Sequence, residues 1–118
     1  MVVMQETRLQ QRIQNLIKSR GGYVHKNWGN MTSEPGIADL TVCYKGYYVA
    51  LEVKEGNGKP SKQQGIHARL VWKAGGIACV VWSVEEAKKL LDILDDNVSW
   101  QALVDKLKKA GLDDGTRW

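Results

Sequence analysis

Two carboxylates and one ammonium group lie among residues that otherwise favour burial. Asp39, Glu52 and Lys54 all fall within the stretch GIADLTVCYKGYYVALEVKEG, residues 36–56. Carboxylate oxygens are the ligands that hard divalent cations prefer. The chemistry open to such a set is the binding of one divalent cation beside a positive group, if the fold brings the three side chains together.

A tight turn in the middle of this stretch would bring them together. If Lys45 and Gly46 are the two central residues of a β-hairpin turn, Asp39 falls directly opposite Glu52. Directly opposed residues have Cβ atoms about 4.5 to 5.5 Å apart, close enough for two carboxylates to share a cation. Lys54 follows two positions after Glu52 and therefore lies on the same face.

The two faces of this predicted hairpin differ in character. One face carries no charge and predicts the core side of a sheet; it comprises Leu40, Val42, Tyr44, Tyr47, Val49, Leu51 and Val53. By spacing alone, the charges on the other face fit the solvated side of an ordinary amphipathic hairpin, with Lys54 paired to a carboxylate. Their neighbours Thr41, Cys43, Tyr48 and Ala50 are poor choices for a fully solvated surface, and they indicate a partly wet face such as the wall of a cleft.

Helices and further strands flank the hairpin in an alternating order. Apolar residues at helical spacing predict an amphipathic first helix, and pairs of glycines or single glycines end several elements. Ser61, Ser83 and Ser99 each stand where a helix N-cap is expected. The expected elements are a helix at 5–20, a short strand or extended entry and then a loop within 23–36, strands at 37–44 and 47–55, a helix at 61–74, a strand at 77–82, a helix at 84–94 and a helix at 99–111.

This order predicts an α/β fold, α-β-β-β-α-β-α with an extra C-terminal helix, in which a mixed sheet is flanked by helices. The 118 residues suffice for a single domain, 1–118, with one core. No apolar run approaches 18 residues, so we expect no membrane span and a cytoplasmic protein. Cys43 and Cys79 lack metal-ligand spacing and are interpreted as buried small hydrophobes.

The charge distribution suggests a polyanionic partner. The net charge is +4, but residues 1–73 hold eleven Lys and Arg against five Asp and Glu, while residues 74–118 hold six against eight. The basic excess therefore lies in the part of the chain that carries the unusual carboxylates. Nucleic acid is the commonest partner of such a region, although many proteins that bind no polyanion are equally basic.

The segments GIAD and LEVK resemble the signature of the PD-(D/E)xK nuclease superfamily, an Asp on one strand and Glu-x-Lys on the next. The wider pattern GIADL…YVALEVKEGNGKPSKQQ…LVWKAGGIACVVWS is similar to the VRR-NUC (virus-type replication-repair nuclease) branch and spans about residues 5–95. The resemblance implies a restriction-endonuclease-like fold and a phosphodiesterase that depends on Mg²⁺ or Mn²⁺. In one departure, Ala38 stands where the family commonly has Pro before its metal-binding Asp.

The resemblance also implies roles for individual residues. Asp39 and Glu52 would bind the metal ion with the backbone carbonyl of Val53. Lys54 would position or activate the attacking water and stabilise the charge of the transition state. Glu6 matches a helix carboxylate that completes the site, although an acidic residue near a helix N-terminus is also favoured by the helix dipole.

Other residues have both a binding and a structural interpretation. Gln64 matches a family Gln beside the active site, but it also forms an S-x-x-Q capping box with Ser61. Residues expected to contact DNA are Lys26, Asn27, Lys59 and Lys62. His25 in the same segment is more often a structural or surface histidine than a base.

Together these features predict a structure-selective DNA endonuclease, one that resolves four-way junctions or other branched DNA in a bacterial cell or a phage-infected host. Small members of the superfamily without other domains typically act as homodimers, and Trp100 and Trp118 are candidates for the dimer surface. The alternatives are an exonuclease or nickase of the same superfamily and a non-catalytic DNA-binding accessory protein.

Overall fold

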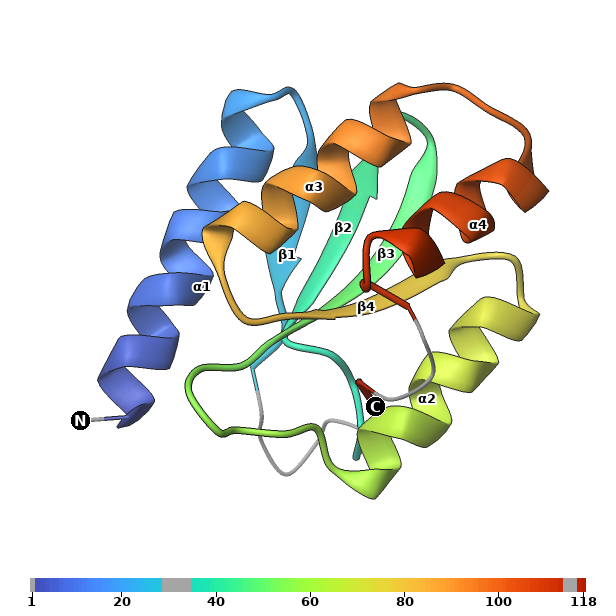
Figure 1. Ribbon diagram of the computed structural model, residues 1–118. Helices are drawn as coiled ribbons and strands as arrows, with labels where there is room; N and C mark the ends of the chain where they lie inside the picture. Colours follow the sequence, from blue (N-terminus) through green and yellow to red (C-terminus); the bar gives the residue numbers. More distant parts are fainter. Residues whose placement is uncertain (1, 29–34, 114–116) are drawn as a thin grey trace.

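The computed structural model describes residues 2–28, 35–113 and 117–118, and it has a four-stranded mixed sheet with helices on both faces (Figure 1). The strands lie in the order β1-β2-β3-β4. The elements in chain order are α1 (Val2–Ser19), β1 (Tyr23–Lys26), β2 (Leu40–Tyr44), β3 (Tyr47–Val53), α2 (Lys62–Lys73), β4 (Ile77–Val81), α3 (Val84–Asp95) and α4 (Trp100–Lys109). The predicted fold class and element order are confirmed.

The hairpin of β2 and β3 has the predicted register. Lys45 and Gly46 have φ angles of 52° and 86°, as a tight two-residue hairpin turn requires. Leu40 is consequently paired with Leu51 at the end of the ladder, and Asp39 and Glu52 occupy the next positions beyond it. Strand β1 pairs antiparallel with β2, whereas β4 returns through α2 to pair parallel with β3.

The main core lies on the apolar face of the sheet. The side chains of Leu40, Val42, Val49, Leu51 and Val53 are at most 1% exposed and pack in one cluster with residues of α1, α3 and α4. In Figure 1, α1 and α3 lie across this face and α4 continues beside α3. The apolar side of the predicted hairpin is therefore buried as expected.

The opposite face is covered by α2, and small side chains let this helix approach closely. Ala38, Ala50, Ala68 and Ala78 form a separate buried cluster between α2 and the sheet. Gly36, with φ of 91°, lies so close to α2 that a Cβ atom there would stand 2.4 Å from the carbonyl oxygen of Gln63. This tight contact holds the chain that leads into Asp39 against the start of α2.

The helix caps are confirmed, and several bounds differ from those expected. The side chains of Ser61, Ser83 and Ser99 each accept a hydrogen bond from a backbone N–H in the first turn of α2, α3 and α4. The two hairpin strands are shorter than predicted, because residues 37–39 and 54–55 lie outside the ladder. The predicted loop within 23–36 falls partly on residues 29–34, outside the described residues.

One expectation about burial is wrong. Cys79 is buried as predicted, but Cys43 is exposed. The cause is that α2 packs over β3 and β4, so that the same sheet face is open at β1 and β2. Separately, no helix in the described parts of the chain has both the length and the apolar character needed to cross a membrane.

Candidate active site

Asp39 and Glu52 meet where β2 begins and β3 ends, and each binds the backbone of the other strand. The N–H of Asp39 donates to Glu52 Oε1 at 3.0 Å. The N–H of Val53 donates to Asp39 Oδ2 at 2.8 Å. These two hydrogen bonds hold the carboxylates side by side in place of further ladder bonds.

Glu52 is the most deeply buried charged residue among those described, with 0% of its surface exposed. Its Oε2 atom accepts from Lys54 Nζ at 3.0 Å and from Gln64 Nε2 at 2.7 Å. The Lys54 side chain is 17% exposed, so solvent contacts the Glu52–Lys54 ion pair at Lys54. The Glu-x-Lys spacing thus places both charges on one face, as predicted.

The electrostatics of the pair are unfavourable without a further positive charge. Burial, and next the nearby charge of Asp39, raises the pKa of Glu52 to about 7. Burial also raises the pKa of Asp39, against the hydrogen bond from Val53 and the charge of Lys54. Burial lowers the pKa of Lys54, but the hydrogen bond and charge of Glu52 outweigh it and leave that pKa raised. The site therefore favours added positive charge.

Gln64 performs both of the tasks that the sequence left as alternatives. Its Oε1 atom accepts from the N–H of Ser61 at 2.7 Å, and its own N–H donates to the Ser61 hydroxyl at 3.2 Å, which completes the capping box. Its Nε2 atom donates to Glu52. The first turn of α2 is thereby linked directly to the carboxylate pair.

Glu6 lies on the first turns of α1, within electrostatic range of the pair. Burial raises the pKa of Glu6 above its usual value. The charge of Lys54 acts in the opposite direction, and the charge of Asp39 adds to the increase. Within the described ranges, no three His, Cys, Asp or Glu side chains are close enough to hold one metal ion together. Glu6 thus faces the site without forming a three-carboxylate cluster with Asp39 and Glu52.

The residues expected to contact DNA have different surroundings. Lys59 and Lys62 are exposed on the loop before α2 and on its first turn. The Lys26 ammonium lies 4.3 Å from the ring centroid of Trp28, and its charge acts on Asp39. Asn27 donates from Nδ2 to the Ala38 carbonyl at 3.0 Å and to Thr41 Oγ1 at 2.8 Å, so this amide joins the ends of β1 and β2.

Comparison with known proteins identifies the family. A solved VRR-NUC domain is 30% identical to this chain, with a TM-score of 0.62 over 74% of this chain and 94% of that one. The chain belongs to the VRR-NUC family of the PD-(D/E)xK nuclease superfamily. No family model and no curated protein matches the sequence.

More distant structures share the VRR-NUC fold. A second VRR-NUC domain protein is 18% identical, with a TM-score of 0.59 over 79% of this chain and 87% of that one. Hjc, a Holliday junction resolvase from the archaeal hyperthermophile Archaeoglobus fulgidus, is also 18% identical, with a TM-score of 0.53 over 65% of this chain and 67% of that one. At this identity, the likeness concerns the fold alone.

Two features of this VRR-NUC site could not be read from the motif. The N–H of Val53 binds Asp39, whereas the motif suggested only its carbonyl as a metal ligand. Glu55, directly after Lys54, has a buried Oε2 atom without a hydrogen-bond partner. The run of charges in LEVKEG was the only sequence signal for Glu55, and it did not separate a site residue from a loop residue.

The donor set fits a hard divalent cation. Asp39 and Glu52 offer carboxylate oxygens, and their raised pKa values show that ionising both is unfavourable without added positive charge. Mg²⁺ is commonly bound by one or two carboxylates and keeps several waters, so two protein carboxylates suffice. Asp39, Glu52 and the Val53 carbonyl are the groups that would hold it.

When a chelator removes divalent metal ions from the solution, we expect the free energy of unfolding of this domain to increase as the pH falls from about 8 to about 5. The pKa of Glu52 is about 7 in the folded protein and 4.5 ordinarily, so the folded state binds a proton that the unfolded chain does not. This stabilisation is complete below about pH 4.5 and is lost as the pH rises through about 7. Thermal unfolding across this pH range measures it.

Asp39→Asn provides the matched variant. Asparagine keeps an oxygen to accept from Val53 but removes the charge that raises the pKa of Glu52. With a metal chelator present at about pH 8, the Tm of the variant is expected to exceed the wild-type Tm by about 4 °C for each kcal/mol of repulsion removed. This difference in Tm should become smaller toward pH 5. A lower Tm at pH 8 would show that the two carboxylates do not repel each other in the folded state.

Proposed function

We propose that this VRR-NUC domain hydrolyses phosphodiester bonds in DNA with Mg²⁺ or Mn²⁺ as cofactor. The observation that carries the proposal is the fully buried Glu52, which lies against Asp39 with Lys54 and Gln64 within 3.0 Å of its Oε2 atom. Full burial of Glu52, with Asp39 and the Lys54 ammonium partly buried beside it, has a high desolvation cost. The binding of a cation and a phosphate gives this arrangement a use that folding alone does not.

Each residue of the site has a distinct part in the proposed reaction. Asp39 and Glu52, with the Val53 carbonyl, hold the cation. When bound, the cation supplies positive charge to the phosphate oxygens and lowers the pKa of a coordinated water. Gln64 fixes the orientation of Glu52 through the hydrogen bond from Nε2.

Lys54 acts on the phosphate group. Hydrolysis forms one bond between the water oxygen and phosphorus, breaks one phosphorus–oxygen bond and leaves a phosphate monoester and a hydroxyl. Negative charge accumulates on the phosphate oxygens as this happens. The Lys54 ammonium, held 3.0 Å from Glu52, can donate hydrogen bonds to those oxygens and position the attacking water.

The surrounding charges suit a DNA substrate. Glu6 interacts electrostatically with Lys54 and Asp39 and would complete the site through a water molecule. Lys59 and Lys62 are exposed beside the active site, at the start of the helix that carries Gln64, and can contact the phosphate backbone. Lys26 adds positive charge on the side of Asp39.

We further propose that the substrate is branched DNA, with the four-way junction as the first candidate. The support is the fold shared with Hjc, whose name describes a Holliday junction resolvase. An exonuclease or nickase remains the alternative within the superfamily, and a DNA-binding accessory protein remains the alternative outside catalysis. Incubation of labelled junction, nicked circle and linear duplex with Mg²⁺ separates these activities by the products.

A homodimer would place two such sites on one junction, and the open sheet face is its proposed interface. This open face comprises Tyr23, Cys43 and Tyr48, adjacent across β1, β2 and β3, together with Leu70 of α2, which lines a pocket with Tyr48. Tyr23 is 63% exposed and Leu70 is 56% exposed. An uncovered apolar surface of this kind favours a protein partner.

The sequence suggested a different dimer interface, at Trp100 and Trp118. Trp118 packs within the chain against the alanine cluster under α2, so its ring does not offer a docking surface. Trp100 is 42% exposed and contacts Trp72 edge to face, with ring centroids 6.0 Å apart. We therefore propose the open face in place of the tryptophans.

The first functional prediction concerns cleavage. Asp39→Asn is expected to lower the rate of junction cleavage in Mg²⁺ by about 10²-fold or more, because a charge that the transition state requires is removed while the fold is kept. Gel analysis of a labelled four-way junction measures the rate. Symmetric cuts near the branch point support resolution, whereas degradation from the ends favours an exonuclease.

Ser61→Ala is the matched control. It removes the hydroxyl that caps α2 but keeps the Ser61 N–H that orients Gln64. The variant is expected to lose about 1 kcal/mol of stability and to keep its cleavage rate within about threefold below its Tm. Absence of cleavage by both the wild type and Asp39→Asn, with DNA binding intact in both, would favour the accessory role.

The second functional prediction concerns the dimer. Burial raises the pKa of the Cys79 thiol to about 12, so Cys43 is the accessible thiol of the chain. As the protein concentration rises, light scattering is expected to report a dimeric mass. Over the same concentrations, maleimide modification of Cys43 is expected to slow. Tyr48→Glu should restore both fast labelling and monomeric mass. A dimeric mass with Cys43 equally reactive at every concentration would place the interface on another face.

A further inference from the structure

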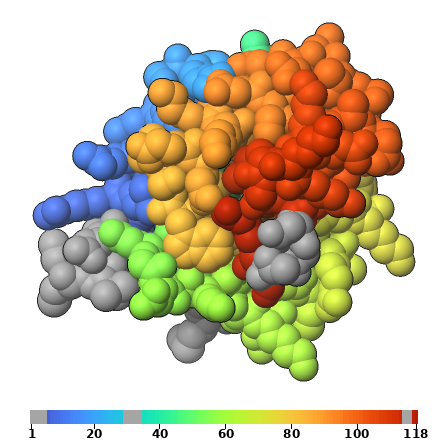
Figure 2. Space-filling view, in the orientation of Figure 1, coloured from blue at the N-terminus to red at the C-terminus, as the bar shows by residue number. Residues whose placement is uncertain are grey.

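A groove of about 770 Å³ adjoins the active site, between α1 and the turn from β4 to α3. Its floor includes Glu55, which directly follows Lys54. Figure 2 shows the two rims, with α1 in blue and the start of α3 in orange, and the segment after β3 in green beneath them. The groove therefore leads away from the site along the helix that carries Glu6.

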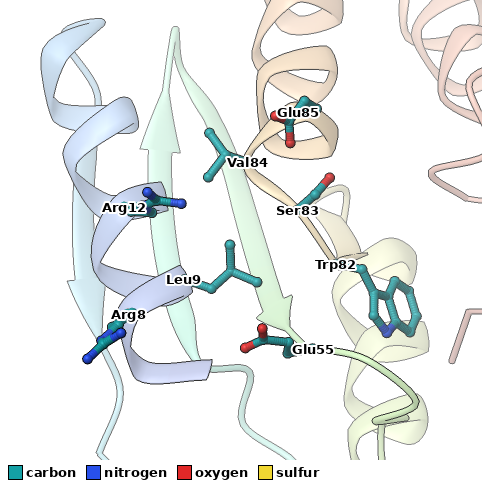
Figure 3. A pocket seen from close by; sticks show the side chains of 8 residues that line it. All are labelled: Arg8, Leu9, Arg12, Glu55, Trp82, Ser83, Val84 and Glu85. Atoms are coloured by element: carbon teal, nitrogen blue, oxygen red, sulfur yellow. The ribbon is translucent and has the colours of Figure 1, made fainter. Parts of the chain in front are cut away.

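Two arginines of α1 line this groove without ion-pair partners. Across the described parts of the chain, neither Arg8 nor Arg12 makes a salt bridge, although both are exposed. By contrast, Arg20 pairs with Asp92 and Asp95, and Arg117 pairs with Glu86. In Figure 3, Arg12 extends toward the gap, whereas the side chain of Arg8, also a lining residue, points outward from α1. The positive charge is thus left available where the groove opens.

We propose that this groove binds one strand of the branched nucleic acid substrate where it is unpaired at the branch, next to the phosphate that is cut, with Arg8 and Arg12 on backbone phosphates. The inference rests on the proposed nuclease function and extends it to the path of the substrate. Four residues of helix advance by about 6 Å, so the two guanidinium groups can contact neighbouring phosphates of an extended strand. The volume is that of a pocket for one small ligand, which suits one or two nucleotides and not a turn of duplex.

The two walls of the groove differ in charge, and this difference orients the strand. Glu85 lines the α3 side, and the buried Oε2 atom of Glu55 has no hydrogen-bond partner. Carboxylates repel phosphates but accept hydrogen bonds from the amino groups of bases. Leu9 and Val84 provide apolar surface between the walls (Figure 3). The phosphates therefore follow α1 and the bases face Glu55 and Glu85.

Salt-dependent binding tests this path separately from catalysis. In an Asp39→Asn background, the affinity for a fluorescent duplex with a single-stranded tail is measured in chelator at several salt concentrations. Arg8→Gln with Arg12→Gln is expected to weaken binding and to reduce the slope of log K against log salt by about 1.4, since each single-strand phosphate contact contributes about 0.7. The affinity for blunt duplex should change much less.

The control removes the same charge from a distant surface. Lys108→Gln with Lys109→Gln changes two exposed residues of α4 and is expected to leave the slope for the tailed duplex unaltered. Equal slope changes in the two double variants, or an unchanged slope in the arginine variant, would overturn the proposal. Absence of cleavage by the otherwise unaltered protein would instead refute the nuclease function, because the binding measurement does not depend on cleavage.

Discussion

The opposition of the buried Glu52 carboxylate and the partly buried Asp39 carboxylate across the ends of β2 and β3 is the constraint on which the rest of the structure depends. Directly opposed like charges destabilise a sheet, and Glu52 is removed from water altogether. Hydrogen bonds to the two carboxylates offset part of this cost. The donors are the backbone N–H groups of Asp39 and Val53, the amide of Gln64 and the ammonium of Lys54. These donors leave the pKa of Glu52 raised, so the site still favours added positive charge.

The two faces of the sheet have different roles, because one forms the main core and the other carries the candidate active site. Large aliphatic side chains on one face pack with α1, α3 and α4 and supply most of the buried apolar area. Alanines on the other face bring α2 close, and with it Gln64, whose capping bond to Ser61 and bond to Glu52 share one amide. Because α2 packs over the β3 and β4 side of that face, Tyr23, Cys43 and Tyr48 are exposed on the rest of it.

Local chemistry made much of the site predictable. The turn at Lys45 and Gly46 determines the register, and the register alone places Asp39 opposite Glu52. Features that depend on how elements pack were not predictable from alternation or capping signals. The exposure of Cys43 depends on the position of α2 over the sheet, and the groove beside Arg12 depends on the distance between α1 and the turn after β4.

Binding of Mn²⁺ to the isolated protein tests whether Asp39 and Glu52 hold a divalent cation, because it requires neither DNA nor turnover. Electron paramagnetic resonance of free Mn²⁺ is recorded as protein is added, for the wild type and for Asp39→Asn. With the wild type, we expect a saturable loss of the free-ion signal, and with the variant a much smaller loss. Equal binding by both proteins, or no binding by a folded wild type, would show that Asp39 and Glu52 do not form a cation site.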